Sequence, residues 1–229
     1  MALTHLVTGA GSGIGASVAR ALAARGDALW LLARNDERAA DLRADFPTAR
    51  VVTADLADPE ALAGQLGQLP QRLDTLLHVA GAVDLGTVAE QPIAQVRRQV
   101  DVNLLAPMEL TRLCLPALRA ARGLVLVVNS TSGITANPDW SAYAASKFGA
   151  RAFTDALRAE EAAHGVRVTS VHPSRTATPM QAEVHRQEGR DYDPDRFIAP
   201  DTVAATILHV IDLPRDGTIT EVTVRPGPR

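Results

Sequence analysis

The sequence predicts an α/β fold, a single domain built on a doubly wound parallel sheet of about seven strands with helices on both faces. Short apolar runs alternate along the chain with segments rich in Ala, Leu, Arg and Glu. Several runs, such as Leu124–Asn129, are almost wholly apolar, as is typical of parallel strands covered on both faces. With 229 residues, 46% of them hydrophobic, the chain is most simply one domain over residues 1–229.

Each expected strand is a run rich in β-branched or other apolar residues. The seven strands are Leu3–Thr8, Ala28–Ala33, Arg50–Ala54, Leu73–Val79, Leu124–Asn129, Val166–His172 and Ile219–Arg225. The helices between them are Ile14–Arg25, Asp36–Asp45, Pro59–Leu69, Ile93–Arg119, Ser141–His164 and Asp201–Asp212. Because strand and helix alternate, right-handed crossovers put helices on both faces of the sheet.

Prolines refine three of these elements. Asp58 followed by Pro59 is typical of a helix start, because Asp caps free N–H groups and proline suits the first helical position. Pro107 and Pro116 predict that the helix between Ile93 and Arg119 is kinked or split. The stretch 173–200 is the least regular, and its length predicts a functional loop, here a substrate lid.

Composition excludes several classes of function. The net charge is −3 without a basic cluster, so no nucleic-acid partner is expected. The apolar runs are too short to span a bilayer, and the first residues lack a signal-peptide pattern. Cys114 is the only cysteine, which fits a cytoplasmic protein with a small core residue at this position. The six histidines are scattered, so no metal site is expected, and no G-x-S-x-G hydrolase motif is present.

A glycine-rich turn, Thr8-Gly-Ala-Gly-Ser-Gly-Ile-Gly15, follows the first strand and precedes a helix. Glycines allow sharp turns and close approach to a ligand, and a helix N-terminus offers free N–H groups to phosphate. The spacing is G-x-x-x-G-x-G rather than G-x-G-x-x-G, because Ile14 stands at the last glycine position. A flexible turn without a ligand is the alternative, but the strand before and the helix after it favour phosphate binding.

The only lysine of the chain, Lys147, follows Tyr143 by four residues. The other 22 of the 23 basic residues are arginine. Positions i and i+4 share one helix face, and an ammonium beside a phenol is expected to lower the phenol's pKa toward the range of a general acid or base. Taken alone, the pattern also fits an exposed lysine and a half-buried tyrosine on an ordinary helix.

Together these motifs resemble the short-chain dehydrogenase/reductase family over roughly residues 3–180. Three further features match the family pattern: Ala80-Gly81 after the fourth strand, Asn103 in Asp-Val-Asn-Leu, and Ser130 thirteen residues before Tyr143. The resemblance implies a Rossmann-type fold and an NAD(P)-dependent oxidoreductase that acts on a carbonyl or alcohol substrate as a homodimer or homotetramer.

The resemblance also implies four catalytic roles. Tyr143 would give its proton to the carbonyl oxygen, Lys147 would hold the nicotinamide ribose and lower the tyrosine pKa, and Ser130 would orient the substrate oxygen. Asn103 would hold a water that links Lys147 to solvent. From the residues alone, Ser130 could merely end a strand and Asn103 could be a satisfied buried amide.

The resemblance assigns cofactor contacts to fourteen residues. They are Gly9, Ser12, Gly13, Ile14, Gly15, Arg34, Asp55, Leu56, Ala80, Gly81, Lys147, Pro173, Thr176 and Thr178. Ala33 stands where an NAD site needs an acid, and Arg34 follows it, so NADP(H) is favoured over NAD(H). Asp36 and Glu37 come too late and are typical of a first helical turn.

The sequence departs from the family pattern at two places. His78-Val79 replaces Asn-Asn, and Ser174 replaces the glycine after Pro173. We expect His78 to be a structural hydrogen-bonding substitute and His172 to be a strand end. The nearby apolar residues of the lid predict a modestly apolar substrate: Met180, Phe197 and Ile198. A non-catalytic NADP(H)-binding sensor or scaffold is the alternative function, but the complete Ser, Tyr, Lys and Asn set favours an enzyme.

Overall fold

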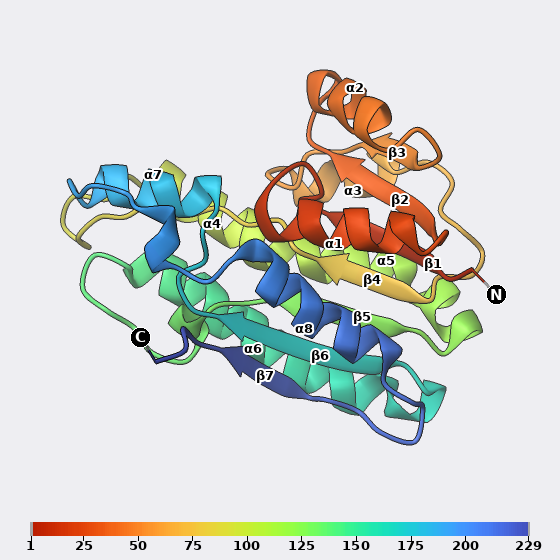
Figure 1. Ribbon diagram of the computed structural model, residues 1–229. Helices are drawn as coiled ribbons and strands as arrows, with labels where there is room; N and C mark the ends of the chain where they lie inside the picture. Colours follow the sequence, from red (N-terminus) through yellow and green to blue (C-terminus); the bar gives the residue numbers. More distant parts are fainter. Residues whose placement is uncertain (1, 229) are drawn as a thin grey trace.

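The computed structural model describes residues 2–228, which form one parallel sheet with helices on both faces (Figure 1). The strands are β1 (Thr4–Thr8), β2 (Ala28–Ala33), β3 (Arg50–Thr53), β4 (Thr75–His78), β5 (Leu124–Val128), β6 (Arg167–Pro173) and β7 (Glu221–Val224). The helices are α1 (Gly13–Ala24), α2 (Asp36–Asp45), α3 (Leu62–Gln65), α4 (Ile93–Val100), α5 (Ala106–Ala121), α6 (Ser141–Glu161), α7 (Pro179–Gln187) and α8 (Pro200–Asp212). Shorter turns are η1 (Pro59–Ala61), η2 (Asp101–Leu105), η3 (Thr131–Gly133), η4 (Ala162–His164) and η5 (Pro194–Arg196).

The sheet order is β3-β2-β1-β4-β5-β6-β7, and every pairing is parallel. β1 pairs with β2 on one side and with β4 on the other, so the strand order reverses beside β1. In an open α/β sheet this reversal leaves a crevice at the carboxyl ends of the strands. The predicted fold class is therefore confirmed, and the site is expected beyond the ends of β1 and β4.

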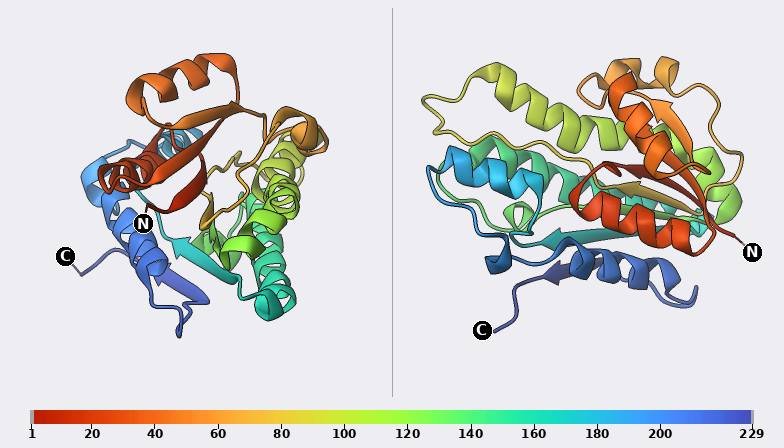
Figure 2. Two further views of the ribbon diagram at one scale, coloured as in Figure 1. Left: turned by 90° about the vertical axis from the view of Figure 1, so that its right-hand side faces the viewer. Right: turned by 45° about the horizontal axis from the view of Figure 1, so that its top comes forward.

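Two apolar layers cover the sheet because consecutive strand residues point to opposite faces. In β1, Val7 packs with α1, α2 and α8, whereas Leu6 packs with α3, α5 and α6. In β5, Leu126 packs in the same layer as Val7, and Val127 packs in the same layer as Leu6. The two helix layers lie on opposite sides of the sheet in Figure 2. Both faces of the central strands are buried, which accounts for their unbroken apolar sequence.

The helix predicted at 59–69 begins at Pro59 as expected but ends early, at Gln65. The chain forms the 3-10 turn η1 and the four-residue helix α3 instead. Asp58 does cap this start, accepting from the Ala61 N–H at 3.3 Å. Gly64 and Gly67, the latter at φ 57°, favour an early end, because glycine has low helix propensity and tolerates the left-handed conformation.

The segment between Ile93 and Arg119 is divided, as its prolines predict. Its two α-helices are joined by the π-helical turn η2, which contains Asn103. Pro107 has no N–H to offer the Asn103 carbonyl four residues earlier, so an unbroken α-helix cannot satisfy that carbonyl. Pro116 lies inside α5 without ending it.

The stretch 173–200 is more regular than predicted, because it contains α7 and η5. Thr178 starts α7, and its hydroxyl accepts from the Gln181 N–H at 3.2 Å. Figure 1 shows α7 beyond the carboxyl ends of the central strands. Among the helices of residues 2–228, none is both long and apolar enough to cross a membrane.

Candidate active site

The glycine-rich turn brings β1, α1 and the end of β4 close together. A Cβ on Gly9 would lie 2.8 Å from the Ala80 nitrogen, and one on Gly15 would lie 2.1 Å from the Gly9 oxygen. Gly13 has φ 51°, and its Cβ would meet the Thr178 side chain at 2.8 Å. Any larger residue would therefore push apart the elements that form this turn.

The N-terminus of α1 is left without a cap of its own. Ser12 stands at the N-cap, but its side chain makes no capping hydrogen bond, and the first turn contains no acidic residue. The free N–H groups and the positive end of the helix dipole therefore remain available to an anion. The turn fits the phosphates of a dinucleotide.

A cleft of about 1720 Å³ runs from this turn across the strand ends. Pockets for single drug-sized ligands measure roughly 300–1,000 Å³, so this larger cleft has room for a dinucleotide and a substrate. Most of the residues predicted from the sequence line it: Gly9, Ser12, Gly13, Ile14, Gly15, Arg34, Ala80, Gly81, Ser130, Tyr143, Lys147, Pro173, Thr176 and Thr178. Asn103, Asp55 and Leu56 do not line the cleft.

The single lysine lies at the floor of the cleft. Lys147 is 4% exposed, and its Nζ donates to the Val128 carbonyl at 3.1 Å. The same atom lies 5.7 Å from the centre of the Tyr143 ring. Burial lowers the Lys147 pKa from 10.5 to about 8, so the amine is mainly charged at pH 7. The expectation of an ordinary exposed lysine is excluded.

Tyr143 lies in the first turn of α6 and is 7% exposed. The expected lowering of its pKa is wrong for the ligand-free chain, because burial raises the pKa to about 12. A hydrogen bond with Ser130 opposes that rise. The effect of burial on the Tyr143 pKa is larger than the effect of the nearby Lys147 ammonium. The ammonium donates to the Val128 carbonyl rather than to the phenol oxygen. The phenol is therefore a neutral proton donor at pH 7.

Ser130 follows β5 and has extended backbone angles, φ −168° and ψ 159°. Its hydroxyl accepts from the Ser132 N–H at 3.0 Å, so the strand-ending role considered for it does occur. The hydroxyl also faces Tyr143 through the hydrogen bond named above. The two roles coexist, because a hydroxyl can accept and donate together.

Asn103 is buried, and its side-chain amide is satisfied by the chain. The Oδ1 atom accepts from the Ala82 N–H at 2.8 Å. The Nδ2 group donates to the Ala82 carbonyl at 2.8 Å and to the Ser146 hydroxyl at 3.0 Å. The amide thus fixes the loop after Gly81 to α6. The water that Asn103 is expected to hold would have to share these partners if it bonded to the side chain.

Both departures from the family pattern have structural explanations. The His78 Nε2 lies 2.9 Å from the Thr111 hydroxyl, and burial lowers the His78 pKa to about 3. His78 is therefore a neutral structural residue, as predicted. Position 174 does not require glycine, because Ser174 does not have a positive φ. In the described chain the non-glycine residues with positive φ are Arg122 and Asp139.

The residue directly after β2 is an arginine without an acidic partner among the described residues. Arg34 lines the cleft, is exposed and makes no ion pair within residues 2–228. Asn35 caps α2, and Asp36 lies in its first turn, as predicted. Asp55 also caps its own turn, accepting from the Ala57 N–H at 2.9 Å. The cofactor contact predicted for Asp55 and Leu56 stays a prediction.

The mouth of the cleft has apolar walls that the sequence did not reveal. Val83 and Val184 pack on Tyr143, and the Trp140 ring meets it edge-on at 5.7 Å between centroids. Met180 and Phe197 line the cleft as predicted. Ile198 does not, because it belongs to the core beneath α8. No pattern marks Val83, since apolar loop residues have no periodicity, and Val184 belongs to the stretch 173–200, which was expected to be irregular.

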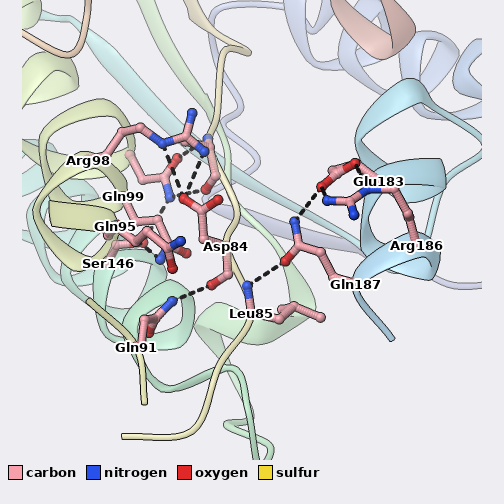
Figure 3. Close-up of polar contacts among 12 residues, drawn as sticks. Asp84, Leu85, Gln91, Gln95, Arg98, Gln99, Ser146, Glu183, Arg186 and Gln187 are labelled. Atoms are coloured by element: carbon pink, nitrogen blue, oxygen red, sulfur yellow. Dashed lines mark hydrogen bonds and ion pairs between the residues drawn. The ribbon is translucent and has the colours of Figure 1, made fainter. Parts of the chain in front are cut away.

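A hydrogen bond joins the two sides of the mouth. Gln187 of α7 accepts from the Leu85 N–H at 2.7 Å, and its amide donates to Glu183 at 2.8 Å. Figure 3 shows Gln187 reaching toward Leu85 while Arg98 holds the preceding Asp84. Helix α7 is thus tied to the loop between β4 and α4.

The buried lysine predicts a pH dependence of stability. An unfolded lysine titrates near 10.5 and the folded one near 8, so the unfolded chain binds more protons between these values. The cost of burying the ammonium is fully present below pH 8 and is relieved as pH rises. Relative to Lys147→Met, the cofactor-free protein should therefore gain free energy of unfolding from pH 8 to 10.

Urea unfolding of both proteins at several pH values measures this difference. Burial also raises the pKa of Cys114 to about 12, which favours the opposite pH trend in stability. Because Cys114 is present in both proteins, the difference between them reports on Lys147 alone. Parallel pH dependences of the two proteins would contradict the depressed lysine pKa.

Comparison with known proteins agrees with this geometry. The sequence profile of the short chain dehydrogenase family matches residues 4–189. A dehydrogenase/reductase SDR family member 7B from Xenopus laevis is 33% identical over 225 residues, which cover 90% of this chain and 70% of that protein. A short-chain dehydrogenase from Streptomyces avermitilis superposes with a TM-score of 0.79 at 27% identity, covering 98% of this chain and 88% of its own.

An alcohol dehydrogenase from Thermococcus sibiricus, complexed with 5-hydroxy-NADP, shares the fold with a TM-score of 0.81 at 24% identity, covering 100% of both chains. The family profile covers most of the sequence, and the cleft contains the serine, tyrosine and lysine that the family pattern requires. The chain belongs to the short-chain dehydrogenase family of oxidoreductases.

Proposed function

We propose that this protein transfers a hydride between NADP(H) and a carbonyl or secondary alcohol substrate, with Tyr143 as general acid and base. The observation that carries the proposal is the convergence of Ser130, Tyr143 and Lys147 in the same cleft as the glycine-rich turn. When bound, the nicotinamide supplies or accepts the hydride, and the protein supplies position and a proton.

The cofactor site fits NADP(H) through groups that have no other partner within residues 2–228. The N-terminus of α1 suits the pyrophosphate, because its N–H groups are uncapped and Gly9 and Gly13 leave room for close approach. Arg34 suits a 2′-phosphate, because a guanidinium binds phosphate by paired hydrogen bonds and no acid competes at Ala33.

Lys147 holds the ribose and supplies positive charge beside the phenol. Its charged amine lies next to Gly81, where a Cβ would come within 3.9 Å of Nζ. The backbone carbonyl of Asn103, which Pro107 cannot satisfy, is the group we assign to a water that relays protons from Lys147. This assignment replaces the side-chain role, because the amide is already engaged.

Tyr143 donates its proton to the carbonyl oxygen, and Ser130 donates a hydrogen bond to the same oxygen. A phenol with a raised pKa is protonated at pH 7, as reduction requires. In the oxidation direction the positive charge of the oxidised nicotinamide favours the phenolate. The apolar wall of Val83, Trp140 and Val184 suits a modestly apolar substrate.

We also propose that the protein is cytoplasmic and self-associates as a homodimer or homotetramer. Leu105, Met108 and Phe148 are each about 41–42% exposed, and the first two line a shallow apolar groove with Leu115 and Phe153. A second copy could cover this surface. Sedimentation that shows only monomer at micromolar concentration would contradict the association.

A substrate panel tests the function. Ketones, aldehydes and alcohols are assayed by nicotinamide absorbance with both cofactors. We expect turnover of at least one substrate, faster with the phosphorylated cofactor. Tight NADPH binding without turnover of any substrate would favour a sensor or scaffold instead.

Arg34→Ala should reduce the preference for NADPH over NADH, measured as the ratio of kcat/KM values, by about 10- to 100-fold. A charge-assisted hydrogen bond has this effect on affinity, and most of the change should appear in KM. Arg43→Ala is the matched control, because Arg43 is exposed on the following helix α2 and does not line the cleft. An unchanged ratio in Arg34→Ala would exclude Arg34 as the phosphate ligand.

A further inference from the structure

His172 is a buried polar residue that the proposed chemistry does not use. It lies near the carboxyl end of β6 and is 0% exposed. Its ring does more than end a strand, because Nδ1 lies 3.1 Å from the backbone carbonyl of Ser130. A carbonyl can only accept, so this contact requires the hydrogen of the imidazole to be on Nδ1.

The Ser130 carbonyl thereby accepts two hydrogen bonds. The second donor is the Gly133 N–H at 2.9 Å, within the turn η3. The preceding residue is fixed as well, because the Asn129 N–H donates to the Val171 carbonyl at 2.7 Å. Since Val171 precedes His172, neighbouring residues of β6 hold the N–H of Asn129 and the carbonyl of Ser130, on either side of the serine. Their positions determine where the serine hydroxyl points.

The other side of the imidazole faces a charged pair. Nε2 lies 3.7 Å from the Oε1 atom of Glu221 on β7 and makes no hydrogen bond within the described residues. Arg151 holds the same carboxylate with two contacts, 2.8 Å from Nε and 3.2 Å from Nη2. Arg151 is on α6, one turn after Lys147. The ring is thus placed between the serine turn and an ion pair that joins β7 to the catalytic helix.

We propose that His172 is a positioning residue for Ser130, acting through the Nδ1–H hydrogen bond to the serine carbonyl. This inference rests on the proposed function, because it matters only if Ser130 acts on the substrate oxygen. The hydrogen bond keeps the hydroxyl directed at Tyr143 and at the space beside it. The Glu221–Arg151 pair keeps the ring from turning away.

Two amide substitutions separate the hydrogen bond from the shape of the ring. In His172→Asn the amide nitrogen can take the place of Nδ1, whereas in His172→Gln it takes the place of Nε2 and cannot reach the Ser130 carbonyl. We expect His172→Gln to lose about three- to tenfold in kcat, the effect of one neutral hydrogen bond. His172→Asn should stay within about twofold of the wild type, and the Kd for NADPH should be unchanged in both.

The pH profile of alcohol oxidation gives a readout that a purely structural role would not change. The Ser130 hydrogen bond lowers the pKa of Tyr143, and the other charged group beside the phenol is Lys147. If Ser130 is displaced, the rise of kcat with pH should move to higher pH in His172→Gln and stay in place in His172→Asn. In a Ser130→Ala background, His172→Gln should cause no further loss of kcat, because its effect passes through the serine.

The outcomes distinguish this inference from the proposed function. Equal losses in the Asn and Gln variants, including a shared failure to fold or to bind cofactor, would overturn it, because ring volume rather than the Nδ1 donor would then matter. An undiminished loss in the Ser130→Ala background would overturn it as well. If only His172→Gln fails to fold while His172→Asn is active, the Nδ1 contact is supported. Absence of any turnover in the wild type would instead overturn the proposed function.

Discussion

Tyr143→Phe should lower kcat by about 10²–10⁴-fold, the usual contribution of a positioned general acid. The substitution keeps the ring that packs against Val83, Val184 and Trp140, and it removes only the hydroxyl. NADPH binding should survive, because the phosphate and ribose contacts come from other elements. Steady-state turnover and NADPH titration by fluorescence measure the two effects separately.

Tyr192→Phe is the matched control, because the chain contains only two tyrosines. Tyr192 stacks on Phe197 with ring centroids 5.9 Å apart and does not line the cleft. Its kcat should remain within about twofold of the wild type. Near-normal turnover of Tyr143→Phe on any accepted substrate would rule out Tyr143 as the proton donor.

Lys147→Arg should lower kcat/KM by at least about 100-fold even though the charge is kept. The amine fits between the Val128 carbonyl and Gly81, and the longer planar guanidinium cannot occupy the same point. A misplaced cation affects both ribose binding and the proton path, so kcat and the Kd for NADPH should both change. Activity within tenfold of the wild type would mean that only the charge is needed.

Much of the fold was predictable because it depends on local patterns. Apolar runs such as Leu124–Val128 are covered on both faces, and their alternation with helices determines the parallel sheet. The glycine-rich turn was equally predictable, because Gly9 and Gly15 leave no room for a side chain. Residues that must be small or must cap a helix reveal their role in the sequence.

The unpredicted features depend on contacts between distant segments. The neutral phenol of Tyr143 results from burial by Val83 and Val184, which lie about 40 to 60 positions away in the sequence. The satisfied amide of Asn103 depends on Ala82 and Ser146, which two other segments supply. Composition and spacing contain no information on how deeply a side chain is buried or on whether its hydrogen bonds are already made. The π-helical turn at Asn103 was predictable only as an interruption, from Pro107.

Chemical modification of the single lysine tests the account most directly. Reductive methylation of the wild type can modify only the N-terminal amine and Lys147, because no other lysine exists. The pKa of about 8 makes the uncharged, reactive amine abundant at pH 8, which helps a small reagent to reach a buried group. Peptide mapping scores both sites, with the N-terminus as internal control. We predict that Lys147 is modified in the free protein with loss of turnover, and that saturating NADP⁺ protects both Lys147 and activity. Modification of Lys147 that NADP⁺ does not slow and that leaves turnover intact would contradict the proposed site.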